Sequence, residues 1–178
     1  KNALQENPDF GEARLLLGKV LLETGDMAAA EKELQGARDL KVSEELVVPV
    51  QARALVVQGQ FKKAIEQYGK VELATPEGRA DLLTTLAMAR VATGDLDAGK
   101  AGLAAALKAV PGYAPAMLGE AKLKAATGDM PGAMAQVEAV LAASPALFEA
   151  WSLKGDIANQ QRAPDVALAA YRKALELL

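Results

Sequence analysis

The sequence predicts an all-α fold built from about five helical hairpins. Three observations lead to this prediction: alanine is abundant, a turn signal recurs every 34 or 35 residues, and small residues recur in step with that turn. Alanine loses no side-chain entropy in a helix, and small side chains let two helices approach closely. A period of this length is typical of arrays in which each repeat is one helical hairpin.

The turn signal is a glycine followed by aspartate or glutamine. It occurs four times, with spacings of 34, 35 and 34 residues, at Gly25-Asp26, Gly59-Gln60, Gly94-Asp95 and Gly128-Asp129. Thirty-four residues further on, Arg162-Ala163 keeps the period but not the turn chemistry. Glycine can adopt the left-handed conformation that ends a helix, and the aspartate can cap the next helix. We therefore expect one helix to end and another to begin at each of the five turns.

Two series of small residues lie at fixed distances from these turns. One lies seven positions before each turn, at Gly18, Ala52, Ala87, Ala121 and Gly155. The other lies five positions after each turn, at Ala30, Ala64, Gly99, Ala133 and Ala167. A larger side chain at either place would push apart the two helices that cross there. These residues are therefore predicted to be buried.

Prolines fall near the predicted helix ends, because proline lacks the N–H that a continuing helix needs. They recur at the end of the repeat as Pro8, Pro76, Pro111 and Pro145. Pro49 lies deeper in its helix, so we expect that helix to begin late. One extra residue in the spacing is assigned to a connection at Glu77-Gly78-Arg79.

The composition excludes several classes of function. The chain has no cysteine and no histidine, which removes thiolate chemistry, disulfides and the commonest general base and metal ligand. A formal net charge of −3 without a basic cluster argues against nucleic-acid binding. No apolar run reaches the ~18–20 residues of a membrane span, so direct membrane insertion is not expected. We expect no cofactor, no metal site and no catalytic residue.

The pattern resembles the tetratricopeptide repeat family. The last repeat carries the consensus residues Trp151, Gly155, Ala167, Tyr171 and Ala174, whereas the first has Arg14 in place of the aromatic residue. The resemblance implies a right-handed superhelical α-α solenoid, in a single array over residues 1–178. Residues 1–10 would end a preceding repeat, and five repeats would span 11–44, 45–78, 80–113, 114–147 and 148–178.

Five longer strings are similar to a bacterial subfamily of that family, the tetratricopeptide lipoproteins of the exosortase and PEP-CTERM protein-sorting system. The strings are residues 1–8, 12–19, 30–34, 52–55 and 58–61. This resemblance implies an exported, lipid-anchored or periplasmic envelope protein of a bacterium that makes exopolysaccharide, while a cytoplasmic location stays open. Because the chain begins at Lys1 and not at a methionine, we expect it to be part of a longer protein.

The resemblance also implies which residues would face a partner. Concave surfaces of solenoids are their usual binding sites, and by the family's geometry the second, fifth, ninth and twelfth residues of each repeat line that groove. The residues that we expect to contact a peptide are Leu15, Lys19, Leu22, Arg53, Val56, Thr84, Met88, Leu118, Lys122 and Asp156. The alternative for each is a structural one, in which the apolar side chains pack against neighbouring helices and the charged ones are solvated.

Three functional hypotheses follow from these sequence features. The leading one is a protein-interaction scaffold that holds a protein or peptide segment in the groove. The second is a structural module that associates with itself through its two ends, in the cell envelope. The third is a repeat region that serves an enzyme whose catalytic domain lies outside residues 1–178.

Overall fold

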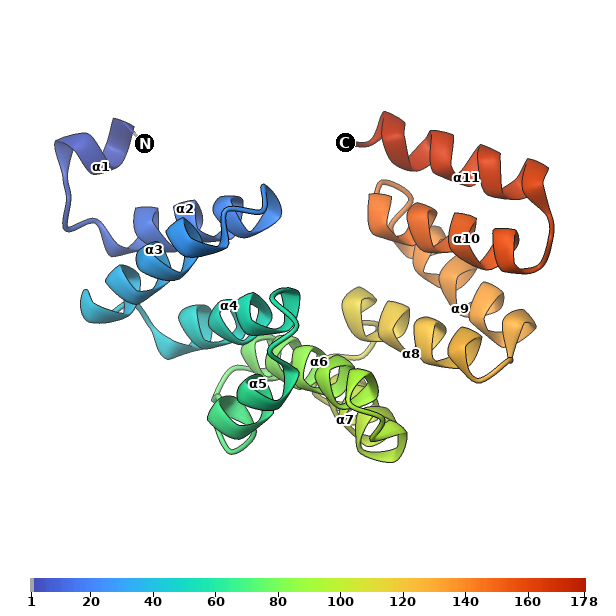
Figure 1. Ribbon diagram of the computed structural model, residues 1–178, viewed down its shortest axis with the longest axis horizontal. Helices are drawn as coiled ribbons and strands as arrows, with labels where there is room; N and C mark the ends of the chain where they lie inside the picture. The colour runs from blue at the N-terminus through green and yellow to red at the C-terminus, as the bar shows by residue number, and fades with distance from the viewer. Residues whose placement is uncertain (1) are drawn as a thin grey trace. The chain divides into compact units, whose positions relative to one another are not determined.

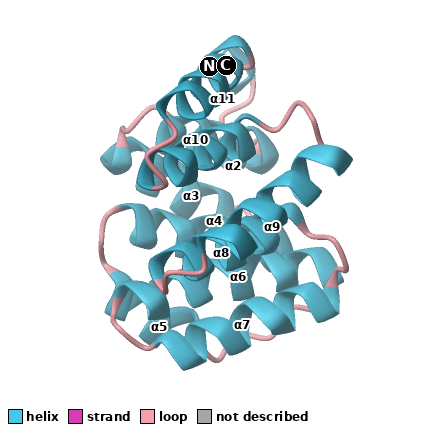
Figure 2. Cartoon of the chain, turned by 90° about the vertical axis from the view of Figure 1, so that its right-hand side faces the viewer, coloured by secondary structure: helices cyan, strands magenta, loops and turns pink. Residues whose placement is uncertain are grey.

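The chain folds into a succession of α-helices joined by short turns (Figure 1). The computed structural model describes residues 2–178, with side chains from Leu4 onward, and within this range every regular element is a helix (Figure 2). The helices are α1 (Asn2–Glu6), α2 (Gly11–Glu23), α3 (Met27–Asp39), α4 (Glu44–Val57), α5 (Phe61–Tyr68), α6 (Pro76–Ala92), α7 (Leu96–Ala109), α8 (Ala114–Ala126), α9 (Met130–Ala143), α10 (Phe148–Gln160) and α11 (Pro164–Glu176). The predicted all-α fold is confirmed.

Within each of the chain's two compact units, consecutive helices pair as hairpins, and neighbouring hairpins pack on one another. Helix α2 packs on α3 and α4 on α5, while α3 also contacts α4, and α4 contacts α6. Later in the chain α8 packs on α9, α9 on α10, and α10 on α11. The residues up to Gly102 form one compact unit and Leu103–Leu178 form another, so the division falls inside α7. The repeat boundaries given above stay a prediction.

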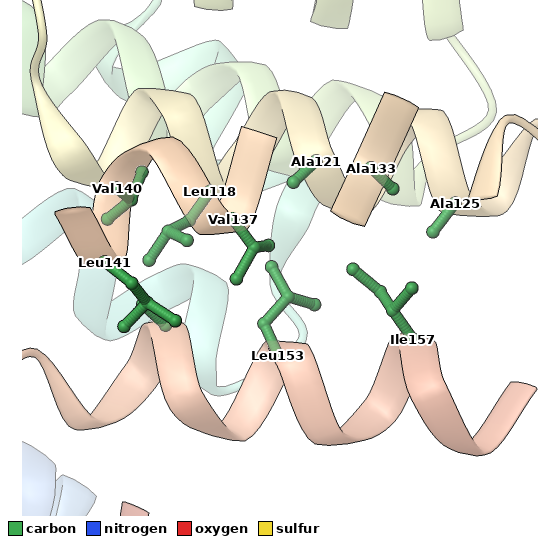
Figure 3. Close-up of a cluster of buried hydrophobic side chains, with 10 residues drawn as sticks. Leu118, Ala121, Ala125, Ala133, Val137, Val140, Leu141, Leu153 and Ile157 are labelled. Carbon is green, nitrogen blue, oxygen red and sulfur yellow. The ribbon is translucent and has the colours of Figure 1, made fainter. Parts of the chain in front are cut away.

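The predicted small residues are buried where helices cross. Ala30, Ala64 and Ala133 are 0% exposed, as are Ala52, Ala87 and Ala121 in the other series. At Gly18 a Cβ atom would lie 2.8 Å from the side chain of Leu34, so even an alanine would be too large there. Larger apolar side chains fill the remaining space around these crossings, as Figure 3 shows for Leu118, Val137, Leu153 and Ile157. This part of the prediction is confirmed.

The five predicted turns share one backbone conformation. Their glycines have positive φ values of 83° at Gly25, 72° at Gly59, 90° at Gly94 and 91° at Gly128. Arg162 takes the same place with φ of 58°. In every turn the residue that follows donates its N–H to the carbonyl oxygen five residues earlier, at 2.8 to 2.9 Å. The period therefore continues through Arg162 although glycine is missing.

The predicted aspartate caps are also confirmed. Asp26, Asp95 and Asp129 each accept a hydrogen bond on Oδ1 from the backbone N–H three residues later, at 3.2, 3.1 and 2.9 Å. Such a bond satisfies one of the free N–H groups at a helix start. Gln60 and Ala163 make no such side-chain bond.

The connection between α5 and α6 differs from the expectation. Helix α5 has 8 residues and α6 has 17, whereas α3, α7, α9 and α11 have 13 or 14. The connection expected at Glu77-Gly78-Arg79 is wrong, because those residues lie in the first turn of α6. Residues 69–75 connect the helices instead.

The carboxylate of Glu45 holds this connection against the start of α4. It accepts hydrogen bonds from the N–H of Ala74 at 2.6 Å, the N–H of Thr75 at 3.1 Å and the hydroxyl of Thr75 at 2.6 Å. The Thr75 Oγ1 atom in turn accepts from the N–H of Gly78 at 3.2 Å, which caps α6. Because three donors converge on one carboxylate, α6 begins a turn earlier than the turn spacing indicates.

The late start expected for the helix that holds Pro49 is also wrong. Helix α4 begins at Glu44 and contains Pro49 in its second turn. Proline removes the N–H that would bond to the carbonyl of Glu45. Two acidic residues in the first turn, Glu44 and Glu45, favour a helix start because the N-terminal end of a helix is electropositive. The hydrogen bonds to Glu45 then fix that start in place.

Replacing Arg162 by glycine should stabilise the protein. A residue with a Cβ atom in the left-handed conformation costs about 1–2 kcal/mol, and glycine avoids this cost. Part of the gain is lost again, because glycine is more flexible in the unfolded chain and loses more entropy on folding. We expect Arg162→Gly to raise the unfolding free energy by about 1 kcal/mol in urea denaturation. The control Arg172→Gly lies inside α11 and should lower it by a similar amount. A loss of stability in Arg162→Gly would contradict the shared turn geometry.

The contribution of Glu45 to stability should depend on pH. The hydrogen bonds from the Thr75 hydroxyl and the Ala74 N–H lower the pKa of Glu45, against the opposing effect of desolvation. A carboxyl whose pKa is lowered by folding stabilises the folded state above its unfolded pKa, and this contribution disappears as the pH falls through the folded pKa. We therefore expect Glu45→Gln to destabilise the protein at pH 7, with a difference from wild type that shrinks below about pH 4.3.

Glu44→Gln is the matched control, because Glu44 makes only a 3.8 Å ion pair with Arg38. Urea denaturation between pH 3 and pH 7 measures both variants. Equal effects of the two substitutions at pH 7, or a Glu45→Gln effect that is independent of pH, would rule out the role given to Glu45.

Candidate binding face

One side of α4 exposes two large apolar side chains and a cation in a single stripe. Leu46 and Val57 are 51% and 54% exposed, and the side chain of Arg53 is 50% exposed. A residue advances about 100° around an α-helix, so positions 7 and 11 residues after Leu46 return to within about 20° of its direction. The three side chains therefore form one stripe, about 16 Å long, which we name the α4 stripe.

The α4 stripe exists because α4 is apolar on nearly all sides. Between Leu46 and Val57 the only polar residues are Gln51 and Arg53. The other faces of the helix are buried: Val47, Val50 and Ala54 pack with α2 and α3, while Val48, Ala52 and Leu55 pack with α5 and α6. A surface helix normally turns a polar face to water. An exposed apolar stripe on such a helix is the kind of surface that marks an interaction site.

Arg53 is held along this stripe by a neighbouring helix. Its Nη2 atom donates to Oδ2 of Asp81 on α6 at 3.3 Å, and the Asp81 side chain is 27% exposed. An exposed ion pair of this kind contributes about 0–1 kcal/mol to stability. A guanidinium has five N–H donors, so this one hydrogen bond leaves others for a second acceptor.

The other accessible residues of the predicted site lie on several helices. Lys19 on α2 and Met88 on α6 are half-buried, as is Val56, which packs on the core beneath α4. Lys122 on α8 and Asp156 on α10 are exposed. Oδ1 of Asp156 accepts a hydrogen bond from the Tyr171 hydroxyl at 2.8 Å, and this bond raises the pKa of Tyr171. Contact of these residues with a partner stays a prediction.

Four residues of the predicted site are inaccessible to a partner, and this corrects the prediction for them. Leu15 and Leu22 are 5% and 8% exposed and pack in the core between α2, α3 and α4. Leu118 is 7% exposed and packs with α9 and α10. Thr84 is 7% exposed, and its hydroxyl donates to the carbonyl oxygen of Ala80 at 2.7 Å. The structural alternative is the right one here, because packing between hairpins covers these positions.

Leu46 was expected to line the groove, as the second residue of its predicted repeat, but it is not among the residues that we expected to contact a peptide. Val57 is a thirteenth residue and lies outside the positions that the family's geometry implied. The signal that could have found Val57 is the apolar run itself, because a helix without a polar face must expose apolar side chains.

A hollow of about 680 Å³ lies at the irregular connection between α5 and α6. It is lined by residues 68–74 and by one side of α6, with the buried Leu73, Leu82 and Leu86 among its walls. The hollow lies beside the C-terminal end of α5, which stops at Tyr68. Arg79 is also at its edge, where its Nε and Nη2 atoms donate to the carbonyl of Leu73 at 3.2 and 3.1 Å.

Metal sites and membrane spans are two further features that the described residues lack. They contain no group of three acidic side chains placed to bind a metal ion. None of the helices in the described range combines the length and the apolar character that a bilayer span requires.

Models of the tetratricopeptide repeat match residues 1–54, 84–148 and 118–178 of the chain. Among solved structures, TTC0263 from Thermus thermophilus, a thermophilic TPR protein, has 25% identity and a TM-score of 0.81, with 94% of this chain and 91% of that chain covered. YrrB, described as a TPR protein with an unusual peptide-binding site, has 18% identity and a TM-score of 0.53, with 99% and 90% covered. PilW, a type IV pilus biogenesis factor, has 17% identity and a TM-score of 0.60, with 95% and 78% covered. A search of curated proteins gave no match.

Proposed function

Because the chain belongs to the tetratricopeptide repeat family, we propose that it is a protein-interaction module that holds a partner segment on the α4 stripe. Proteins of this family are generally protein-interaction scaffolds. The observation that supports this site is the α4 stripe, where Leu46 and Val57 are more than half exposed on a helix without a polar face. Burial of both side chains by a partner would remove this apolar surface from water.

The geometry of the stripe defines the partner's chemistry. Two apolar side chains lie about 16 Å apart along the helix axis, with a cation between them. An extended segment covers this distance in about five residues, and a helical one in about eleven. The partner segment would therefore carry two apolar side chains with an acidic group between them that pairs with Arg53. Lys19 and Met88, on the helices beside α4, would extend the contact.

One of the structural neighbours supports the class of ligand. YrrB is described as having an unusual peptide-binding site. At 18% identity the likeness concerns the fold, so the residues of that site do not transfer to this chain.

The proposed setting of this function is the bacterial envelope. The support is the likeness of residues 1–8, 12–19 and 30–34 to exported lipoproteins of the exosortase and PEP-CTERM system. In that setting the module would bind a partner in protein sorting or exopolysaccharide production. Recovery of the full-length protein from the cytosol of its own organism, and not from the envelope fraction, would contradict this setting.

Binding of peptides should depend on the α4 stripe. A library of 12-residue peptides displayed on phage is selected against the immobilised protein, and the affinity of the selected peptides is measured by fluorescence anisotropy. Half-burial of each apolar side chain contributes about 1 kcal/mol, so we expect Leu46→Ser with Val57→Ser to weaken binding by about thirtyfold. Arg53→Gln should weaken mainly the acidic peptides.

Leu168→Ser is the matched control, because Leu168 is 50% exposed but lies on α11. It should leave the affinity unchanged. If the selected peptides lose as much affinity in Leu168→Ser as in the double variant, or bind the double variant as tightly as wild type, the α4 stripe is not the binding site.

A further inference from the structure

The hollow at the connection between α5 and α6 has one wall formed by a single side of α6. The residues of this wall are Arg79, Leu82, Leu83, Leu86 and Arg90. Residues three, four, seven and eleven positions apart share one side of an α-helix. Three leucines therefore form an apolar floor, with an arginine at each end and about 16 Å between the two arginines along the helix axis.

The opposite wall is formed by Tyr68 and the connection that follows it, residues 69–74. Leu73 is buried and Val71 is half-buried, so this wall is also partly apolar. Tyr68 is 6% exposed, and its hydroxyl donates to Oε1 of Gln51 at 3.4 Å. The volume of about 680 Å³ lies within the range of about 300–1,000 Å³ that is typical of small-molecule sites.

The charges around the hollow are mostly positive, although the whole chain has a formal net charge of −3. The described lining residues include three cations, Lys70, Arg79 and Arg90, and one acidic residue, Glu72. Arg79 already donates to the carbonyl oxygen of Leu73. Arg90 is half-buried, and within the described part of the chain neither its side chain nor that of Lys70 forms an ion pair. The hollow is therefore complementary to an anion.

The balance of hydrogen-bond donors and acceptors narrows the class of ligand. The lining side chains offer cationic donors and apolar contact, but Glu72 is the one charged acceptor among them. A carboxylate has only acceptors, and an alkyl chain has no polar group to satisfy. A peptide segment would instead bring backbone N–H groups, and each N–H that is buried without an acceptor costs free energy. The walls thus favour an apolar molecule with an anionic end over a peptide.

We propose that the hollow binds a single-chain carboxylate amphiphile of the fatty-acid class. The alkyl chain lies on Leu82, Leu83 and Leu86, and the carboxylate pairs with Arg90. Arg90 takes the carboxylate because its guanidinium has all its donors available for a bidentate pair, whereas Arg79 is engaged by the connection. This site goes beyond the binding of a partner segment, because no residue of the α4 stripe lines the hollow.

Isothermal titration calorimetry with octanoate, decanoate and dodecanoate tests this site. We expect one dodecanoate to bind per chain, with an affinity that rises by up to about fourfold for each added methylene group that is buried. The uncharged 1-decanol has the chain length of decanoate and should bind about tenfold more weakly, because it cannot form the charge-assisted pair.

Variants of Arg90 locate the carboxylate. Arg90→Gln should weaken dodecanoate binding about tenfold, whereas Arg90→Lys keeps the charge and should lose less. Arg172→Gln is the matched control, because Arg172 is exposed on α11 and does not line the hollow; it should bind dodecanoate like wild type. Far-UV circular dichroism checks that the variants remain helical.

Several results would overturn the proposal. Absence of dodecanoate binding at about 1 mM excludes the site. Equal affinities for decanoate and 1-decanol exclude the role of the charge, and a series that does not depend on chain length excludes the apolar floor. If Leu46→Ser with Val57→Ser weakens dodecanoate binding as much as Arg90→Gln does, the amphiphile binds the α4 stripe instead.

The binding of peptides separates this proposal from the proposed function. The peptides selected on the α4 stripe should bind Arg90→Gln with unchanged affinity, and they should not displace dodecanoate. A selected peptide that displaces dodecanoate and loses affinity in Arg90→Gln would show that the hollow is a peptide site, which contradicts the class of ligand proposed here. Failure to select any peptide would count against the α4 stripe and leave the dodecanoate result unaffected.

Discussion

The close approach of helices at small residues is the constraint on which the rest of this structure depends. Where Gly18 crosses α3, a single added Cβ would lie 2.8 Å from the side chain of Leu34, and Ala30 on that helix is 0% exposed. Because the backbones lie so close, each hairpin presents a narrow edge of larger apolar side chains to the next hairpin. Within each of the two compact units, such edges between neighbouring helices supply the packing, as is typical of a repeat array.

The candidate binding face arises from a local departure from this regular packing. Helix α4 lies between two core clusters, and its sequence supplies apolar residues to both of them and to the outside as well. On its far side the short α5 and the connection held by Glu45 replace the usual second helix. The irregular connection therefore belongs to the same hairpin that carries the α4 stripe. A surface for binding can differ from the repeat consensus because the exposed positions are not needed for the close crossings.

The sequence predicted the features that depend on residues near one another in the chain. Each turn is fixed by a conformation that glycine favours and by hydrogen bonds over five residues, so its period remained visible even at Arg162. The early start of α6 could not be predicted, because it depends on Glu45, which lies 30 residues from Thr75 in the chain. For a related reason the sequence could not decide between groove and core for Leu15 and Leu118: the family's positions describe a face, whereas packing by the next hairpin decides exposure. One recurring contact could not be predicted, because different residue types make it. Arg14, Arg79 and Trp151 each lie in the first turn of a hairpin's first helix, and each donates a side-chain N–H to the carbonyl oxygen six residues earlier.

Hydrogen exchange of the Ala30→Leu variant tests most directly whether close crossings stabilise each hairpin through its neighbours. Three added carbon atoms at a position with 0% exposure must separate α2 from α3. The backbone amides of α2, α3 and the adjoining α4 should lose protection, while those of α8 to α11 should exchange as in wild type. Equal loss of protection along the whole chain would show a single cooperative core, and unchanged protection in α2 and α3 would show that the crossing at Ala30 does not determine their packing.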